Sequence, residues 1–230
     1  MIKAIRNALK VKDIRERILF TLLCLAVVRL GSQLPIPGID RSKISDFLSQ
    51  ITQLSFLNAI TGGSFEQLSI FALSITPYIT SSIIMQLLTI AIPRLEEIQK
   101  EGEDGRKKIA AATRYVTVGL ALIESVAMAI GFGRSGYLEN YSVLSIIVIT
   151  LTLTAGSAFL MWIGEKITDR GVGNGISIIL LVNIVSRMPS DVINLFKTYV
   201  IGGTTVINKV IAAIMIVGII VALTIYIIVL

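Results

Sequence analysis

The chain has 230 residues, of which 54% are hydrophobic and 16% are charged, and its formal net charge is +6. Soluble domains carry about 25% charged residues, so the composition favours an integral membrane protein. The sequence contains no histidine and a single cysteine, which argues against zinc hydrolysis, His-dependent nucleophilic catalysis and disulfides, and we expect no enzyme.

Six apolar stretches separated by polar loops account for most of the sequence. A helix of about 20 apolar residues crosses a bilayer core about 30 Å thick, and four of the stretches have roughly that length. Backbone polar groups in lipid must be satisfied within the segment, so the stretches are expected to be helices. The predicted fold class is an all-α, polytopic transmembrane helix bundle with about six spans. The predicted spans are residues 18–34, 75–92, 115–132, 143–163, 176–188 and 210–230.

Basic residues gather in residues 1–17, in the loop after the second span and in the loop after the fourth span. Because Lys and Arg concentrate on the cytoplasmic side of membrane proteins, the N-terminus is predicted to be cytoplasmic. Most of the positive charge then reflects the orientation of the chain in the membrane and does not indicate nucleic-acid binding. Residues 1–17 alternate basic and apolar side chains at helical spacing, which predicts an amphipathic helix on the inner membrane surface. No small-residue cleavage site follows, so no removable signal peptide is expected.

The segment between the first two spans holds a turn and a short apolar run. Pro35, Pro37 and Gly38 cannot continue a helix, so the first span is predicted to end there. The apolar run at residues 56–60 is too short to cross a bilayer. It is either an extracellular turn packed on the bundle or a re-entrant half-helix, and the composition leaves both open.

Polar side chains inside the spans are candidate functional residues. The second span contains Pro77 and several hydroxyl side chains, so it is expected to face protein or water. Ile75 and Ile79 are four residues apart and share one helix face. Glu124 lies near the middle of the third span, where a charge is costly. It either lines a cavity or is a protonated, hydrogen-bonded carboxyl at a helix contact, and the sequence leaves both open.

Two loops contain several glycines. Residues 96–108 have mixed charge and are predicted to form a solvated cytoplasmic loop with turns at Gly102 and Gly105. The basic run at its end is suited to an acidic partner. Residues 171–175 are not a phosphate-binding loop, because the required Gly-Lys-Ser/Thr ending is missing. A flexible turn between the fourth and fifth spans is predicted instead.

Several motifs occur in the order in which one family of membrane proteins has them. They are Pro35-Ile36-Pro37-Gly38-Ile39, Ser69-Ile70-Phe71-Ala72-Leu73 with Pro77-Tyr78-Ile79, Gly105-Arg106-Lys107-Lys108-Ile109, and Trp162-Ile163-Gly164-Glu165-Lys166 leading into Arg170-Gly171-Val172-Gly173-Asn174-Gly175. Together they cover nearly the whole chain, and they resemble the SecY family of bacterial protein-translocation channels.

The resemblance implies a SecY-like bundle in the bacterial inner membrane. Such a channel threads unfolded polypeptides across the bilayer and releases apolar segments sideways into lipid. The implied partners are the small subunits SecE and SecG, the motor ATPase SecA, the ribosome and the secretory polypeptides themselves. The resemblance implies no cofactor, because the ATP chemistry belongs to the motor, and no direct nucleic-acid function.

The resemblance also assigns roles to individual residues, and it favours the re-entrant interpretation of the short run, as a plug that closes the pore. The implied plug residues are Ser55, Phe56, Leu57, Asn58, Ala59, Ile60, Thr61, Gly62, Gly63 and Ser64. An apolar pore ring, which excludes ions yet lets a peptide pass, is implied at Ile75, Ile79 and Leu180. The lateral gate is implied at Ser82, Gln86 and Glu124, although the family more often has an uncharged amide at the last position. Contact with a cytoplasmic partner is expected at Arg106, Lys107 and Lys108.

The family has ten spans in two inverted halves, which implies the domain organisation. Residues 1–17 are the cytoplasmic N-terminus, 18–188 the first half, 189–209 an external loop and 210–230 the sixth span. The chain is therefore expected to be part of a longer protein, and by itself it is not expected to enclose a pore. The alternative function is a multi-pass solute or ion transporter that uses Glu124. A structural or assembly membrane protein without a pore ranks third. A membrane enzyme ranks last, because no acid, base and nucleophile are grouped.

Overall fold

The computed structural model describes residues 11–39, 60–138 and 141–195, together with Lys197, Met215, Val217 and Gly218. The chain divides into two compact units, Met1–Ile184 and Val185–Leu230. Met215, Val217 and Gly218 are helical where the sixth span is predicted. The rest of that span lies outside the described residues, as do residues 1–10 of the predicted amphipathic helix.

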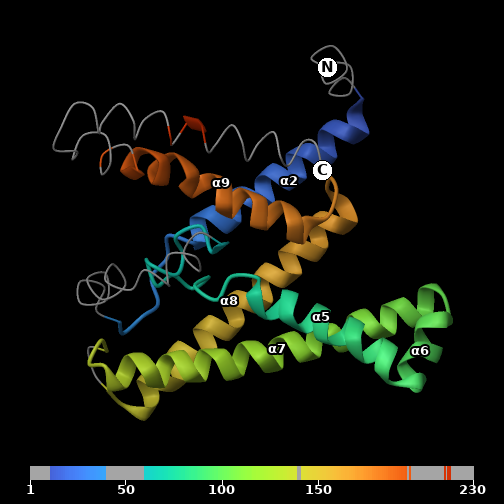
Figure 1. Ribbon diagram of the computed structural model, residues 1–230, viewed down its shortest axis with the longest axis horizontal. Coiled ribbons are helices and arrows are strands. Elements are labelled where there is room, and N and C mark those ends of the chain that lie inside the picture. Colours follow the sequence, from blue (N-terminus) through green and yellow to red (C-terminus); the bar gives the residue numbers. More distant parts are fainter. Residues whose placement is uncertain are drawn as a thin grey trace. The chain divides into compact units, whose positions relative to one another are not determined.

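Helices and isolated β-bridges make up the regular structure of these described residues, which confirms the all-α fold class. The helices are α2 (Lys12–Gly31), α5 (Thr76–Ala91), α6 (Pro93–Lys100), α7 (Glu103–Arg134), α8 (Val143–Arg170) and α9 (Gly175–Leu195). Within the first unit, α7 packs most extensively on α8, α5 and α6 pack on α7, and α2 packs on α8 (Figure 1).

Three of the described helices are long and apolar enough to cross a membrane: α7, α8 and the Gly175–Asn194 part of α9. The pair α5 and α6 passes the same test as one broken span with a bend of 101°, which raises the number to four. Helix α2 covers most of the predicted first span, but charged side chains in its first turns and Arg29 near its end exclude it from this set. The described residues are therefore those of a membrane protein.

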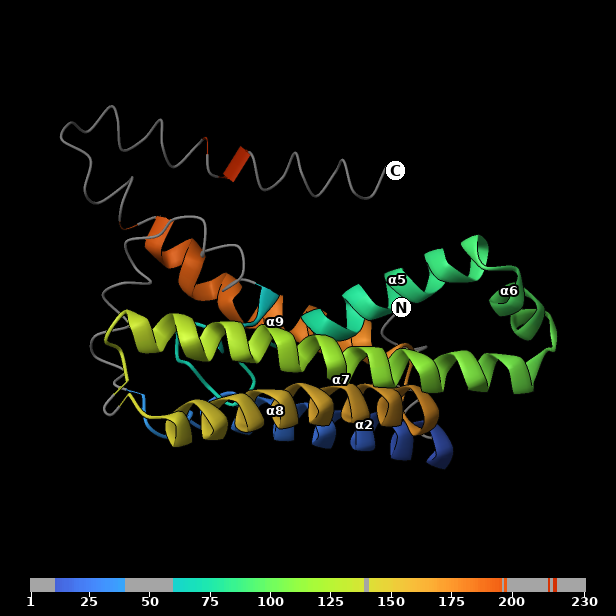
Figure 2. The same ribbon diagram turned by 90° about the horizontal axis from the view of Figure 1, so that it is seen from below.

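A stripe of small side chains explains the extensive packing of α7 on α8. The stripe consists of the buried residues Thr113, Thr117, Ala121, Ser125, Ala129 and Gly133. Residues four apart lie on one helix face, and small side chains let membrane helices approach closely. Ser125 Oγ lies 2.8 Å from Thr154 Oγ1 of α8, and both hydroxyls are buried. The two helices form the long hairpin seen from the side in Figure 2.

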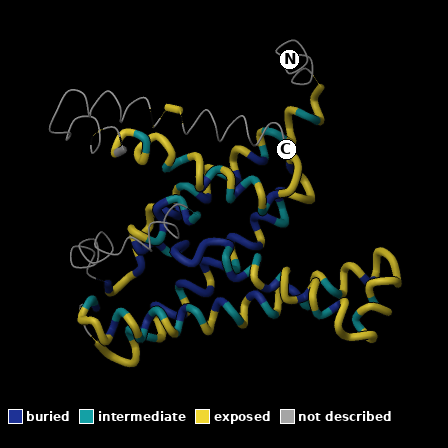
Figure 3. The backbone as a smooth tube through the Cα atoms, viewed as in Figure 1, coloured by how far each residue is buried: buried dark blue, intermediate teal, exposed yellow. Residues whose placement is uncertain are grey.

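A segment without helical structure, residues 61–75, runs through the core of the first unit (Figure 3). Leu68, Phe71 and Ile75 in this segment are at most 3% exposed. Irregular backbone at membrane depth is tolerated only where protein or a water-filled cavity surrounds it. The segment finds its backbone partners in the chain that follows α2, because the Ile70 N–H donates to the Leu34 carbonyl over 3.0 Å.

Two backbone features accompany this buried segment. Gly156 of α8 permits its close approach, because a Cβ there would collide with the carbonyl of Ile70. Leu68 and Ser74 have φ angles of 45° and 54°, and this left-handed conformation costs roughly 1–2 kcal/mol for a residue with a Cβ. Burial of the apolar side chains of the segment has to offset that cost.

The chain after α5 corrects one prediction. Residues 96–108, predicted as a solvated loop, are helical except for a break at Glu101 and Gly102, where Gly102 has a φ of 82°. Gly105 is not in a turn; it lies buried in α7, where a Cβ would collide with the carbonyl of Ile98 in α6. The mixed charges support helices because Lys100 pairs with Glu96 one turn away, at 2.6 Å.

Candidate functional site

The start of α5 carries an apolar cluster. Pro77 lies in the first turn of α5, where its missing N–H is not needed. The side chains buried in this cluster are Cys24, Val28, Phe71, Ile75, Leu160, Ile163, Ile167 and Ile179. They come from α2, the 61–75 segment, α8 and α9, so four parts of the chain meet at this point. Ile79, one turn further along α5, is half-buried and packs against the cluster.

The three predicted pore-ring residues have different environments. Ile75 is completely buried, whereas Ile79 and Leu180 are half-buried. Ile75 and Ile79 share the apolar cluster, but the residues that α9 contributes to it include Ile178 and Ile179 and not Leu180. The structure therefore brings two of the three together, and the pore-ring role stays a prediction.

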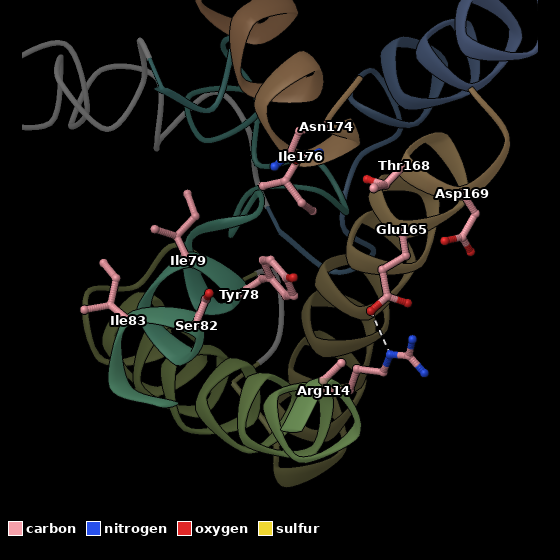
Figure 4. A pocket seen from close by; sticks show the side chains of 11 residues that line it. Tyr78, Ile79, Ser82, Ile83, Arg114, Glu165, Thr168, Asp169, Asn174 and Ile176 are labelled. Carbon is pink, nitrogen blue, oxygen red and sulfur yellow. Dashed lines mark hydrogen bonds and ion pairs between the residues drawn. The ribbon is translucent and has the colours of Figure 1, made fainter. Parts of the chain in front are cut away.

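A polar cavity of about 420 Å³ borders the apolar cluster. Ile79 and Ile176 pack against the cluster and also line the cavity, so the two features are in direct contact. The cavity wall comes from α5, α7, α8 and the start of α9. Its residues are Tyr78, Ile79, Ser82, Ile83, Ala110, Arg114, Glu165, Thr168, Asp169, Asn174 and Ile176 (Figure 4).

An ion pair joins two helices in the wall of this cavity. Arg114 Nε of α7 donates to Glu165 Oε1 of α8 over 2.7 Å (Figure 4). The two side chains are 52% and 22% exposed, and water-screened pairs of this kind contribute up to about 1 kcal/mol. Asp169 lines the same cavity one turn after Glu165. The cavity is therefore lined by charges of both signs.

A second cavity of about 260 Å³ lies further along α5. The two cavities share Tyr78, Ser82 and Ala110 in their walls. Of the predicted lateral-gate residues, Ser82 lines both cavities and Gln86 lines the second, whereas Glu124 lines neither. Glu124 is half-buried on α7. The structure thus brings Ser82 and Gln86 together on α5, and the gate assignment stays a prediction.

The predicted cytoplasmic contact residues lie in the first turns of α7 and are exposed. Lys107 Nζ is 3.7 Å from an Asp104 oxygen, and Lys108 Nζ is 2.7 Å from an oxygen of Glu101. Arg106 lines the second cavity. Both lysines thus have acidic neighbours within their own segment, and a role in partner contact stays a prediction.

Residues 55–59 of the predicted plug lie outside the described residues, and residues 60–64 lie within them. Gly62 has a φ of 64°, and a Cβ built on it would lie 3.0 Å from the Cα of Asn183 in α9. Arg29 Nη1 of α2 donates to the Gly62 carbonyl over 3.4 Å. Glycine is required here by conformation and by proximity, and the C-terminal end of the predicted plug is anchored between α2 and α9.

The predicted turn between α8 and α9 is present, and it carries hydrogen bonds that the sequence analysis did not identify. Asn174 Oδ1 accepts from the Ile176 N–H over 3.1 Å and caps the start of α9. Thr21 Oγ1 of α2 accepts from the Val172 N–H over 3.1 Å. An Asn directly before an apolar run is a common N-cap signal, so the first of these bonds was open to prediction.

Taken together, the described residues place an apolar cluster directly beside a polar cavity. An apolar constriction gates a path by excluding water, and its aliphatic side chains can shift without breaking hydrogen bonds. No group of three or more His, Cys, Asp or Glu side chains suited to a metal ion occurs in the described part of the chain.

Comparisons with known proteins point to one family. The SecY family model matches residues 69–230. The protein translocase subunit SecY of Halalkalibacterium halodurans is 46% identical over 201 residues, which cover 86% of this chain and 46% of that protein. The protein of the same name from Bacillus subtilis is 45% identical over 206 residues, covering 88% and 48%. The chain spans about half the length of the curated relatives it matches.

Solved structures share the fold. Sec61 in the canine ribosome–channel complex from the endoplasmic reticulum matches with a TM-score of 0.52 and 18% identity, over 83% of this chain and 39% of that one. A structure described as that of a protein conducting channel matches with the same TM-score and identity. At this level of identity the likeness concerns the fold alone.

Proposed function

The chain belongs to the SecY family, and from this we propose that it forms part of the wall of a protein-conducting channel. Such a channel passes unfolded polypeptides across the membrane and releases apolar segments sideways into the lipid. The observation that carries the proposal is the junction between the polar cavity and the apolar cluster. Ile79 and Ile176 belong to both, so a polar path leads directly to an apolar closure.

The junction suggests how the closure works. A polypeptide in the polar cavity keeps its backbone groups hydrated, while the aliphatic side chains seal around it and exclude ions. We assign the seal to Ile75, Ile79 and Leu180. Because Ile75 is completely buried, we expect it to reach a passing chain only after the start of α5 shifts. The hydrogen bond from Arg29 to the Gly62 carbonyl supports this arrangement, because it ties the end of the proposed plug to α2.

The surroundings of the channel follow from the family and the charge distribution. We place the chain in the bacterial inner membrane with its N-terminus in the cytoplasm, because basic residues gather in residues 1–17 and in the loops after the second and fourth predicted spans. SecE, SecG, the SecA motor and the ribosome are the proposed partners, and the exposed basic start of α7 is the proposed cytoplasmic contact. The role requires no catalytic group and no cofactor in this chain.

Crosslinking tests the proposal in membranes where the chain is part of the complete channel and a secretory precursor is stalled in it. Cys24 is first replaced by Ser, and single cysteines are then introduced as Ile75→Cys, Ile79→Cys and Leu180→Cys. The matched control is Leu151→Cys, because Leu151 is 60% exposed on the outer face of α8. We expect the precursor to crosslink at the seal positions and not at the control. Equal labelling at all four positions would remove the proposal.

The Glu124→Gln variant distinguishes the alternative function, a solute or ion transporter, from the proposed channel. A solute path through this carboxyl predicts loss of uptake of a small molecule, whereas the channel proposal predicts unchanged crosslinking of the precursor. Glu124 lines neither of the two cavities along α5, which favours the channel.

A further inference from the structure

Arg29 is the only charged residue in residues 18–34, the predicted first span. It lies in the last turn of α2 and is half-buried. A charge inside an apolar span is costly, so it is normally kept for a specific contact, which can be a backbone carbonyl. Arg29 Nη1 donates to the carbonyl of Gly62, 33 positions away in the sequence, over 3.4 Å. The contact therefore joins the end of α2 to the start of the buried 61–75 segment.

Gly62 is enclosed between this guanidinium and α9. A Cβ built on Gly62 would lie 3.0 Å from Arg29 Nη1 and 3.0 Å from the Cα of Asn183. Asn183 is 4% exposed and shares one face of α9 with the completely buried Ile179, because the two residues are four apart. The start of the segment is thus held from two sides, by the end of α2 and by α9.

The segment that begins at this contact is strained at its other end and in its middle. Leu68 and Ser74 have left-handed φ angles of 45° and 54°, and such residues persist only where surrounding contacts hold them. Ser74 Oγ is also buried and forms no hydrogen bond with any described residue. A buried hydroxyl without a partner is unfavourable, and it gains a partner when it reaches water. Both features favour a shift of the segment, and Ser74 directly precedes Ile75 of the proposed seal.

We propose that Arg29 is a positioning residue for the seal, because its contact with Gly62 keeps the strained segment and the start of α5 in the buried position. When the contact is lost, the left-handed residues relax and Ser74 Oγ reaches water, so Ile75 leaves the apolar cluster. The inference rests on the proposed function, since it supplies the shift of α5 that brings Ile75 to a passing chain.

Alkylation of a single cysteine measures this shift in the complete channel without any precursor. Cys24→Ser and Ile75→Cys are combined, and the rate of reaction with a water-soluble maleimide is followed. Labelling requires local opening, so its rate follows the population of the open segment. Adding Arg29→Gln should raise the rate about tenfold, the lower end of the range for one hydrogen bond of a charged group. The matched control is Arg134→Gln, which removes an exposed cation from the last turn of α7 and should leave the rate unchanged.

A pair of glycine variants tests the same contact without a change of charge. Gly62→Ala places a methyl group in the enclosed position between α2 and α9. Gly38 is also left-handed, with a φ of 84°, but its Cβ position has nothing within 4 Å. Both alanines carry the penalty of a left-handed residue with a Cβ, so the two variants differ in the collision. We expect faster alkylation at Ile75→Cys with Gly62→Ala and the original rate with Gly38→Ala.

Two further measurements separate positioning from a general loosening of the chain. Ser74→Ala should slow alkylation at Ile75→Cys about fivefold, because the buried state then has no hydroxyl without a partner. A cysteine introduced as Thr117→Cys, at a completely buried site between α7 and α8, should react at the same low rate with and without Arg29→Gln.

Three outcomes would overturn the inference. Equal acceleration at Ile75→Cys and Thr117→Cys would show general loosening, and equal effects of a variant and its matched control would show that the contact is not involved. An unchanged rate at Ile75→Cys after Arg29→Gln would mean that the backbone hydrogen bonds of residues 34–36 hold the segment by themselves. Because no precursor is present, each of these outcomes leaves the crosslinking test of the channel unaffected.

Discussion

The hydrogen bond between Ser125 and Thr154 allows a direct test of how α7 and α8 are held together. Replacing Ser125 by Ala and Thr154 by Val removes the two hydroxyls with little change in volume. Both side chains are at most 8% exposed, so water does not replace the lost partner. We expect each single variant to unfold more easily than the original chain.

The size of the effect follows from how the two hydroxyls are used. Ser125 Oγ lies 2.6 Å from the Ala121 carbonyl, and Thr154 Oγ1 lies 2.8 Å from the Thr150 carbonyl. Each hydroxyl has one hydrogen, so one of them donates across the interface while the other donates within its own helix. After either substitution the remaining hydroxyl keeps a carbonyl partner, and no buried polar atom is stranded. The coupling free energy should therefore be close to the average for membrane proteins, about 0.6 kcal/mol, and below the observed maximum of about 1.7 kcal/mol.

A double-mutant cycle measures this coupling, with unfolding of the chain in mixed micelles followed by Trp162 emission and far-UV circular dichroism. The matched control is a second double-mutant cycle, in which Ser125→Ala is combined with Thr152→Val in place of Thr154→Val. Thr152 donates to the Val148 carbonyl of its own helix over 2.7 Å and is half-buried. The control cycle should give a coupling near zero. A coupling near zero for Ser125 with Thr154, or an equal one for Ser125 with Thr152, would refute the reasoning.

Two further predictions concern helix contacts in the same unit. Gly105→Ala should destabilise the chain by roughly 1–3 kcal/mol in the same unfolding assay, because its Cβ meets the Ile98 carbonyl. Gly119→Ala is the matched control in the same helix; its Cβ meets open space, so it should stabilise by up to about 1 kcal/mol, and equal effects of the two would count against the α6–α7 contact. Glu165→Gln and Arg114→Gln should each cost at most about 1 kcal/mol at low salt and less in high salt, because water screens their ion pair. The double variant should lose no more unfolding free energy than either single variant. Additive losses of unfolding free energy would show that the two side chains do not act as a pair.

The positions of the helices were predictable from apolar length, but their ends were not. Helices α5, α7, α8 and α9 overlap predicted spans, and the all-α class is confirmed. The start of α7 at Glu103 was missed because polar, mixed-charge sequence was interpreted as a loop. The pairing of Lys100 with Glu96 at helical spacing was the available signal, and it indicates helix where hydropathy indicates only solvent.

The candidate site was predictable only as separate residues. Ile75 and Ile79 were predicted to share one helix face; in the structure Ile75 lies directly before α5, and both residues belong to one apolar cluster. The polar cavity beside them was not predicted, because Arg114 and Glu165 are far apart in sequence and no local pattern links them. The burial of the non-helical 61–75 segment was also not predicted, since a backbone partner such as Leu34 is distant in sequence.

The sequence by itself determined that this chain lies in a membrane as a set of helices. In lipid every backbone polar group needs a partner nearby in the chain, so apolar length is enough to specify both location and secondary structure. Only the tertiary structure decided which helix faces meet, where the chain leaves the helical conformation and where water can enter. Those outcomes depend on distant partners, such as Gly156 beside the Ile70 carbonyl and Leu34 as acceptor for the Ile70 N–H. Between helices surrounded by lipid, close packing and hydrogen bonds replace the hydrophobic effect as the selecting force, and neither can be read from hydropathy along the chain.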